Sequence, residues 1–182
     1  GQVCCAGSRV FVHENIYDKF VAALVDAFGK VNVGDPLDPA TQMGAQVNKR
    51  QAEKILSYVE IAKQEGATVA CGGDYYTENG CDKGSFIQPT LITNVTNDMR
   101  VAQEEIFGPV AVVIKFKTEE EVVEMANDSS YGLGGAVWTK NLNRALRVAQ
   151  NIETGRVWVN TYNQIPEGAP FGGYKQSGIG RE

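Results

Sequence analysis

The sequence predicts a single α/β domain with a largely parallel sheet and flanking helices. Short runs of β-branched and aromatic residues alternate with longer segments whose apolar residues recur at helical spacing. This alternation indicates parallel strands, because two parallel neighbours need a crossover connection that is usually a helix. The chain has 182 residues, of which 43% are hydrophobic, enough for one core but short for two typical domains.

The first half of the chain predicts two strands and two helices. A strand is expected at residues 9–12, and a helix at residues 14–30 with a buried stripe of Ile16, Phe20, Leu24 and Phe28. A second helix is expected at residues 47–64, ended by Gly66, with one apolar face made of Ala52, Ile55, Leu56, Val59 and Ala62. Residues 68–71 then resume an extended run.

The second half alternates strand and helix more regularly. Strands are expected at residues 110–116, 135–139 and 156–160, after an extended segment at residues 86–95 that Pro89 interrupts. Thr118 and Glu121 have the spacing of a capping box, and Asn141 can cap a helix carrying Leu142, Ala145, Ala149 and Ile152. The C-terminal residues 160–182 are rich in glycine, proline and polar side chains, as functional loops often are.

Composition argues against several classes of protein. The net charge is −5 and the basic residues are dispersed, so neither nucleic acid nor an anionic membrane is an expected partner. No apolar run approaches the roughly 20 residues of a membrane span, and no signal peptide is evident, so we expect a cytoplasmic protein. Four cysteines in a chain with an ample core indicate reduced thiols, and one histidine without a C-x-x-C pair predicts no metal site.

The stretch GQVCCAGSR places two adjacent cysteines in a glycine-flanked loop before the first strand. In one interpretation, one of these thiols is a nucleophile, and the backbone N–H of Cys4 could stabilise the oxyanion that forms when it attacks a carbonyl. In the other, both cysteines are small core side chains at the start of a strand. The only histidine, His13, lies nine residues after Cys4 at the far end of a short strand. A direct Cys–His pair would require the chain to fold back, so a papain-like hydrolase fits poorly.

The stretch VAQEEIFGPV permits two interpretations. It can be a short helix carrying Glu104 and Glu105, ended by Gly108 and Pro109. Alternatively, Glu105 can accept hydrogen bonds from two ribose hydroxyls while Phe107 offers a flat surface to a heteroaromatic ring. The glycine-rich PFGGYKQSGIG lacks the G-K-[ST] ending of a phosphate loop, so its glycines indicate tight turns or close backbone packing.

Five segments, taken in order, resemble the aldehyde dehydrogenase superfamily: GQVCCAGSRVFV, FIQPTLI, EEIFGPV, NDSSYGLGGAVWT and PFGGYKQSGIGRE. The resemblance covers essentially the whole chain. It implies that residues 1–182 form the catalytic, nucleophile-bearing domain. It also implies that the family's N-terminal dinucleotide-binding domain and C-terminal oligomerisation segment are absent from these residues.

The resemblance also implies roles for individual residues. Cys4 matches the nucleophile, with Cys5 as an uninvolved neighbour. Glu105 is expected to hold the nicotinamide ribose and Phe107 to lie beside the nicotinamide. The residues that would line the aldehyde tunnel are Asn163, Ile165 and Phe171. Asn160 matches the family's asparagine that follows the last strand, and Glu182 matches a glutamate of the active-site floor.

The expected activity is NAD- or NADP-dependent oxidation of a small aldehyde to a carboxylic acid through a thioester on Cys4. The longer protein is expected to be a homodimer or homotetramer. In the family, a side-chain amide of the oxyanion hole lies before the nucleophile in the sequence, outside these 182 residues. The 182 residues alone are therefore expected to turn over little aldehyde, because loss of such an amide typically lowers the rate of acyl transfer about 100-fold or more. A CoA-acylating relative, a non-redox cysteine hydrolase or acyltransferase, and a non-catalytic module remain alternatives.

Overall fold

The computed structural model describes residues 1–182 and divides into two compact units. The first unit contains Gly1–Val3 and Ser8–Lys115, and the second contains Cys4–Gly7 and Phe116–Glu182. The expectation of one catalytic domain over the chain stays a prediction. None of the helices combines the length and the apolar character that a membrane span requires.

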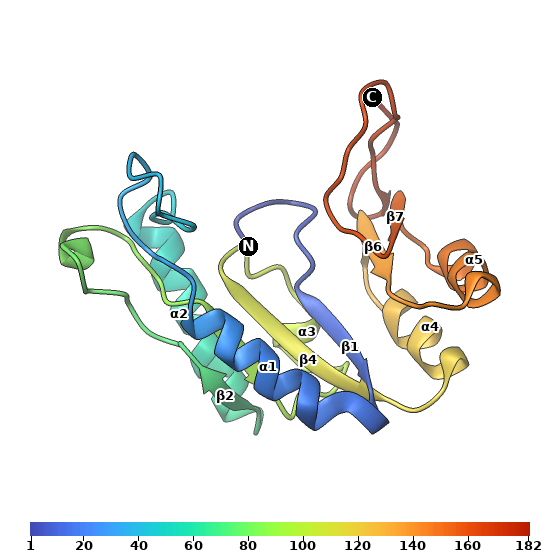
Figure 1. The fold of residues 1–182 in the computed structure, drawn as a ribbon, viewed down its shortest axis with the longest axis horizontal. Coiled ribbons are helices and arrows are strands. Elements are labelled where there is room, and N and C mark those ends of the chain that lie inside the picture. Colours follow the sequence, from blue (N-terminus) through green and yellow to red (C-terminus); the bar gives the residue numbers. More distant parts are fainter. The chain divides into compact units, whose positions relative to one another are not determined.

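The first unit is built on a four-stranded sheet in the order β1-β4-β3-β2. Its strands are β1 (Arg9–His13), β2 (Thr68–Cys71), β3 (Thr90–Thr93) and β4 (Val110–Phe116). β3 pairs with β4 in parallel, whereas β2 is antiparallel to β3. Figure 1 shows β1 and β4 pointing toward the same end. The predicted α/β fold with a mostly parallel sheet is therefore confirmed, with β2 as an antiparallel edge strand.

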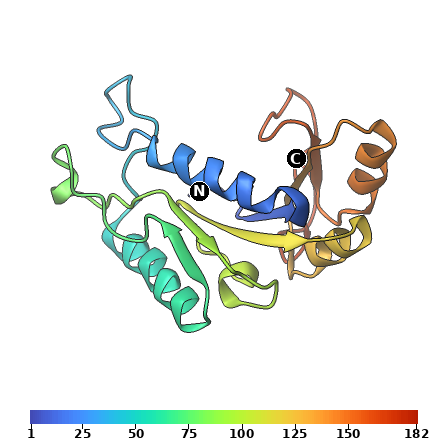
Figure 2. The same ribbon diagram turned by 60° about the horizontal axis from the view of Figure 1, so that its bottom comes forward.

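Helices cover both faces of this sheet. The unit contains α1 (Tyr17–Gly29), α2 (Lys49–Gln64) and the short α3 (Arg100–Gln103). Figure 2 shows α1 above the strands and α2 below them. One core cluster consists of Val12, Tyr17, Leu91 and Val113, against which the apolar side of α1 packs. On α2, the predicted apolar positions Ala52, Ile55, Val59 and Ala62 are buried.

The predicted buried stripe of α1 is wrong in its first half. Ile16 is 55% exposed and Phe20 is 38% exposed. A strict four-residue repeat drifts around a helix of 3.6 residues per turn, so such a stripe leaves the buried face. In addition, residues 14–16 form a 3-10 turn, in which His13 Nδ1 accepts from the Asn15 N–H at 3.2 Å. The face that packs on the core consists of Tyr17, Val21, Leu24, Val25 and Phe28.

The second unit contains a parallel strand pair with a helical crossover. β6 (Gly134–Val137) pairs in parallel with β7 (Arg156–Val159), and α5 (Leu142–Asn151) connects them. β5 (Tyr131–Gly132) pairs antiparallel with β8 (Tyr174–Lys175), and α4 (Glu119–Asn127) precedes both pairs along the chain. Figure 1 shows the tail, residues 160–182, projecting from β6 and β7 as a long loop.

The ends of α4 and α5 follow the capping signals. The Thr118 side chain accepts from the Glu121 N–H at 3.2 Å, and the Glu121 carboxylate accepts from the Thr118 N–H, which completes the predicted capping box. Asn141 caps α5 through the Arg144 N–H. The apolar face of α5 differs from the prediction, because Leu142 is 71% exposed while Ala145 and Val148 are buried.

We expect Thr118→Ala to lower the free energy of unfolding by about 1 kcal/mol, because the Glu121 N–H loses its acceptor at the start of α4. Urea denaturation followed by circular dichroism measures the change. Thr77→Ala, at an exposed position outside any helix or strand, is the matched control and should stay within about 0.5 kcal/mol. Equal losses in the two variants would contradict a capping role.

Candidate active site

The two adjacent thiols lie in one turn but in different environments. Cys4 is exposed, whereas Cys5 is only 5% exposed. The Cys5 thiol donates to Asn163 Oδ1 at 3.3 Å. Burial raises the pKa of Cys5, and the neighbouring Cys4 adds to the shift. Cys5 therefore stays a protonated, enclosed thiol at neutral pH, and Cys4 is the member of the pair that a small molecule can reach.

Tyr162 holds this turn in place. Its hydroxyl donates to the Cys5 carbonyl at 2.6 Å, and its ring centroid lies 4.8 Å from that of Trp158. Burial raises the pKa of Tyr162 to about 12, with Cys5 as a second cause, so the hydroxyl remains a donor across the physiological range. A Cβ at Gly7 would lie 3.3 Å from the Tyr162 hydroxyl oxygen. A side chain at position 7 would therefore crowd the Tyr162 hydroxyl.

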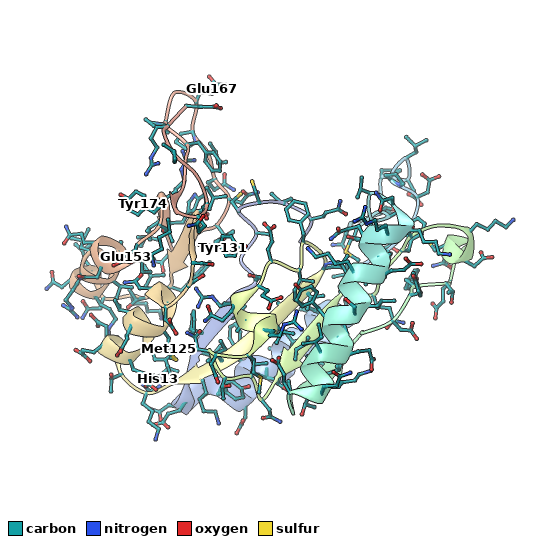
Figure 3. The ribbon with its side chains drawn as sticks, turned by 180° about the vertical axis from the view of Figure 1, so that it is seen from behind. His13, Met125, Tyr131, Glu153, Glu167 and Tyr174 are labelled. Carbon is teal, nitrogen blue, oxygen red and sulfur yellow. The ribbon has the colours of Figure 1, made fainter.

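The three predicted tunnel residues lie on the tail, in the same unit as Cys4. Asn163 and Ile165 are exposed, and Phe171 is half-buried. The residue between the first two, Gln164, accepts a hydrogen bond from Trp158 Nε1 at 2.7 Å. Figure 3 shows Glu167 at the outer tip of the tail loop, beyond Tyr131 and Tyr174. The tail is thus anchored at its base, next to the residues predicted to contact the aldehyde.

Phe171 is held by Arg156 and Glu182. The Arg156 guanidinium lies 5.4 Å from the Phe171 ring centroid and donates to the Pro170 carbonyl at 2.8 Å. Phe171 and Glu182 exchange two backbone hydrogen bonds, of 2.8 and 2.9 Å. The segment that carries Glu182 is therefore paired with the segment that carries Phe171.

Asn160 has a structural role at the end of β7. Its Oδ1 accepts from the Thr139 N–H at 2.9 Å and its Nδ2 donates to the Thr139 carbonyl at 3.0 Å. Its backbone N–H donates to Val137. These bonds join the ends of the two parallel strands from which the tail departs.

The predicted cofactor residues belong to the first unit, just after α3. The helical interpretation of this stretch is wrong beyond Gln103, because Glu104 has an extended backbone. The Glu104 carboxylate accepts from Arg100 and Tyr58, and these hydrogen bonds, Arg100 first, lower its pKa to about 2. Glu105 is exposed, and its carboxylate makes no hydrogen bond. Of the two adjacent glutamates, only Glu105 has a carboxylate available to a ligand.

Side chains of α2 anchor the segment that carries Glu105 and Phe107. Gln51 Nε2 donates to the carbonyls of Ile106 and Phe107, each at 3.0 Å. Lys54 Nζ donates to the Glu105 carbonyl at 2.9 Å. Phe107 has a φ of 59°, in the left-handed region that non-glycine residues rarely adopt. These bonds hold a strained backbone that presents Glu105 and Phe107 together.

Sequence reasoning missed Gln51 and Lys54. Both line a hollow of about 410 Å³, together with Val47, Asn48 and Arg50. The hollow therefore adjoins the segment that carries Glu105 and Phe107. Polar residues three positions apart on a helix are common, so the sequence offers no signal that distinguishes these two. Their role follows from hydrogen bonds to residues more than 50 positions away.

No group of three or more histidine, cysteine, aspartate and glutamate side chains lies close enough to hold a metal ion. His13 belongs to the first unit and accepts a hydrogen bond from its near neighbour Asn15. The four cysteines are free. The second unit offers an accessible thiol at Cys4, and the first unit offers an unpaired carboxylate at Glu105.

Comparison with known proteins identifies the family. The model of the aldehyde dehydrogenase family matches residues 1–182. The chain is 57% identical over 182 residues to an aldehyde dehydrogenase from Enchytraeus buchholzi, covering 100% of this chain and 36% of that protein. It is 54% identical to a betaine aldehyde dehydrogenase from Brucella anthropi, covering 100% of this chain and 37% of that protein.

A solved structure supports the same assignment. The betaine aldehyde dehydrogenase from Staphylococcus aureus in complex with NAD+ superposes with a TM-score of 0.97 at 48% identity, over 99% of this chain and 36% of that one. The chain therefore spans little more than a third of the length of these relatives. Because the family match extends from the cysteine turn to the end of the tail, this chain belongs to the aldehyde dehydrogenase family.

Proposed function

We propose that this chain supplies the catalytic thiol of an NAD-dependent aldehyde dehydrogenase that oxidises an aldehyde to a carboxylic acid. The contrast between exposed Cys4 and enclosed, hydrogen-bonded Cys5 carries the proposal, because it leaves one accessible thiol in a turn held by the tail. The names of the relatives, an aldehyde dehydrogenase and a betaine aldehyde dehydrogenase, support the reaction class.

The chemistry at Cys4 has two stages. The Cys4 thiolate adds to the aldehyde carbon, and the carbonyl oxygen becomes an oxyanion that the Cys4 N–H can stabilise. Loss of hydride from that carbon leaves a thioester on Cys4. Water then attacks the thioester carbon, the C–S bond breaks, and the carboxylic acid leaves with Cys4 restored as a thiol.

The residues around Glu105 fit a nicotinamide dinucleotide. NAD, when bound, supplies the acceptor for the hydride. The unpaired Glu105 carboxylate can accept hydrogen bonds from both hydroxyls of a ribose, and Phe107 offers an apolar surface to a flat ring. The adjoining hollow, lined by Arg50 and Lys54 among others, offers cationic N–H donors to the rest of a nucleotide. The hydrogen bonds that Gln51 and Lys54 of α2 donate to the backbone of residues 105–107 keep this segment in one conformation.

We infer that these residues belong to a longer protein, because the chain spans little more than a third of its relatives' length. The family resemblance motivates further proposals about that protein: a dinucleotide-binding domain, an oligomerisation segment, assembly into a homodimer or homotetramer, and a cytoplasmic location. Low activity of the 182 residues alone is a further proposal of this kind.

We expect Cys4→Ala, in the protein that contains this chain, to lower aldehyde-dependent NADH formation about 1000-fold or more, because the covalent route is lost. Absorbance at 340 nm with short aldehydes measures it. Cys71→Ala, at a half-buried thiol in the first unit, is the control and should keep most of the activity. Dependence on added CoA would assign an acylating enzyme instead, and ester hydrolysis without nicotinamide a non-redox one.

Thiol labelling gives an independent check on the pair. Iodoacetamide at neutral pH is expected to alkylate Cys4 first, because it is exposed, as measured by peptide mass mapping. Burial raises the pKa of Cys5 and so lowers its thiolate fraction at any given pH, so Cys5 should label more slowly than Cys4 and gain on it as the pH rises. Cys81, which is 3% exposed, is the buried reference. Labelling of Cys5 ahead of Cys4 would contradict the assignment of the nucleophile.

We expect Glu105→Gln to lower kcat/KM for NAD about tenfold, because a neutral amide offers weaker acceptors to the ribose than a carboxylate does. Initial rates at varied NAD concentration measure the change. The rate of Cys4 alkylation should stay as in the unmodified protein. Glu78→Gln, at an exposed loop position, is the matched control. An unchanged kcat/KM in Glu105→Gln would rule out a cofactor role for this carboxylate.

A further inference from the structure

The hydrogen bond between Cys5 and Asn163 joins two parts of the second unit that lie far apart in the chain. Cys5 Sγ donates to Asn163 Oδ1 at 3.3 Å, across 158 positions. The preceding tail residue, Tyr162, donates to the Cys5 carbonyl at 2.6 Å. Cys5 is thus held at its thiol and at its backbone by two consecutive tail residues.

This bond decides which end of the Asn163 carboxamide faces outward. A carboxamide has an acceptor oxygen at one end and two N–H donors at the other. Because Oδ1 faces the Cys5 thiol, the donor end points away from it. Asn163 is exposed, and Nδ2 makes no hydrogen bond. Two unpaired N–H donors therefore lie on the open side of the residue that contacts the thiol turn.

The backbone at Asn163 adds an independent observation. Its φ is 58°, in the left-handed region. Non-glycine residues in this region are found disproportionately often at functional sites. Asparagine tolerates this region better than most residues, and the side-chain bond to Cys5 and the Tyr162 bond hold the segment there. Two positions further along, Ile165 is 50% exposed and offers an apolar surface on the same tail.

We propose that Cys5 is a positioning residue whose S–H orients the Asn163 carboxamide, so that the Asn163 N–H groups select aldehydes carrying an oxygen acceptor near the carbonyl carbon. The proposal rests on the proposed function and deepens it by assigning a substrate class. The acceptor is an ether, hydroxyl or carboxylate oxygen on an otherwise apolar chain, since Ile165 supplies no polar contact. The raised pKa of Cys5 agrees with a thiol that stays a donor.

The test uses pairs of aldehydes that differ by one oxygen for one methylene. Methoxyacetaldehyde is paired with butanal, and 3-methoxypropanal with pentanal. For each pair, the selectivity is kcat/KM for the ether divided by kcat/KM for the alkyl aldehyde. The intrinsic reactivity of each aldehyde is the same for every variant, so changes in selectivity report the contact. The longer protein is compared with its Asn163→Leu, Cys5→Ala and Cys5→Ser variants.

Asn163→Leu and Cys5→Ala are each expected to lower the selectivity about 3- to 10-fold for at least one pair, the value of one neutral hydrogen bond. Cys5→Ser keeps a donor and is expected to stay within about twofold of the unmodified protein. Where Cys5→Ala does not fold, Cys5→Val removes the donor while filling the space. Unchanged selectivity in Cys5→Ala overturns the role of Cys5, and unchanged selectivity in Asn163→Leu overturns the substrate class.

A binding measurement separates this proposal from the proposed function. Calorimetry compares methoxyacetate with butyrate, and 3-methoxypropionate with pentanoate, in the same four proteins. It requires no turnover. If no aldehyde yields NADH, the proposed function fails, while the ratio of dissociation constants still decides the role of Cys5 and Asn163. A ratio that falls in Cys5→Ala and Asn163→Leu but not in Cys5→Ser supports the proposal; a ratio that is constant across the variants overturns it.

Discussion

The candidate active site depends on the hydrogen bond from the Tyr162 hydroxyl to the Cys5 carbonyl. The cysteine turn has no regular secondary structure of its own and belongs to the unit formed mainly by the last third of the chain. Its position is therefore set by the tail, through Tyr162 and the aromatic packing behind it. The tail in turn is held by Trp158 and Arg156 of β7. A parallel strand pair thus supplies the rigid base for both the thiol and the residues predicted to contact the aldehyde.

In two pairs of identical adjacent residues, the surroundings make one side chain accessible and enclose or bind the other. Cys4 and Cys5 are adjacent, yet burial and a hydrogen bond enclose one thiol and leave the other accessible. Glu104 and Glu105 are also adjacent, yet Arg100 and Tyr58 occupy the first carboxylate and leave the second unpaired. In both pairs, one member holds the segment and the other is free to act. Rigidity next to a reactive group is what positional catalysis requires.

Three of the residues described above have a backbone in the left-handed region. Phe107, Asn160 and Asn163 all have positive φ values, of 59°, 55° and 58°. Each is held by specific bonds: Gln51 to the Phe107 carbonyl, Thr139 to the Asn160 side chain, and Cys5 to the Asn163 side chain. Such conformations cost on the order of 1–3 kcal/mol and persist where the surroundings hold them in place. At Phe107 the surrounding structure therefore maintains a backbone conformation that the residue disfavours, whereas asparagine adopts this region more readily.

The sequence by itself determined the α/β pattern, the bounds of β2 and β4, the capping box at Thr118 and the five segments that indicate the family. The strand bounds and the capping box depend on residues a few positions apart, and the family segments are recognised from residue identity alone. Only the tertiary structure decided that Ile16 and Phe20 are exposed, that Gln51 and Lys54 anchor the Glu105 segment, and that Cys5 binds Asn163. The bonds of Gln51, Lys54 and Cys5 join residues more than 50 positions apart, and their partners are set by the packing of helices and strands rather than by sequence spacing.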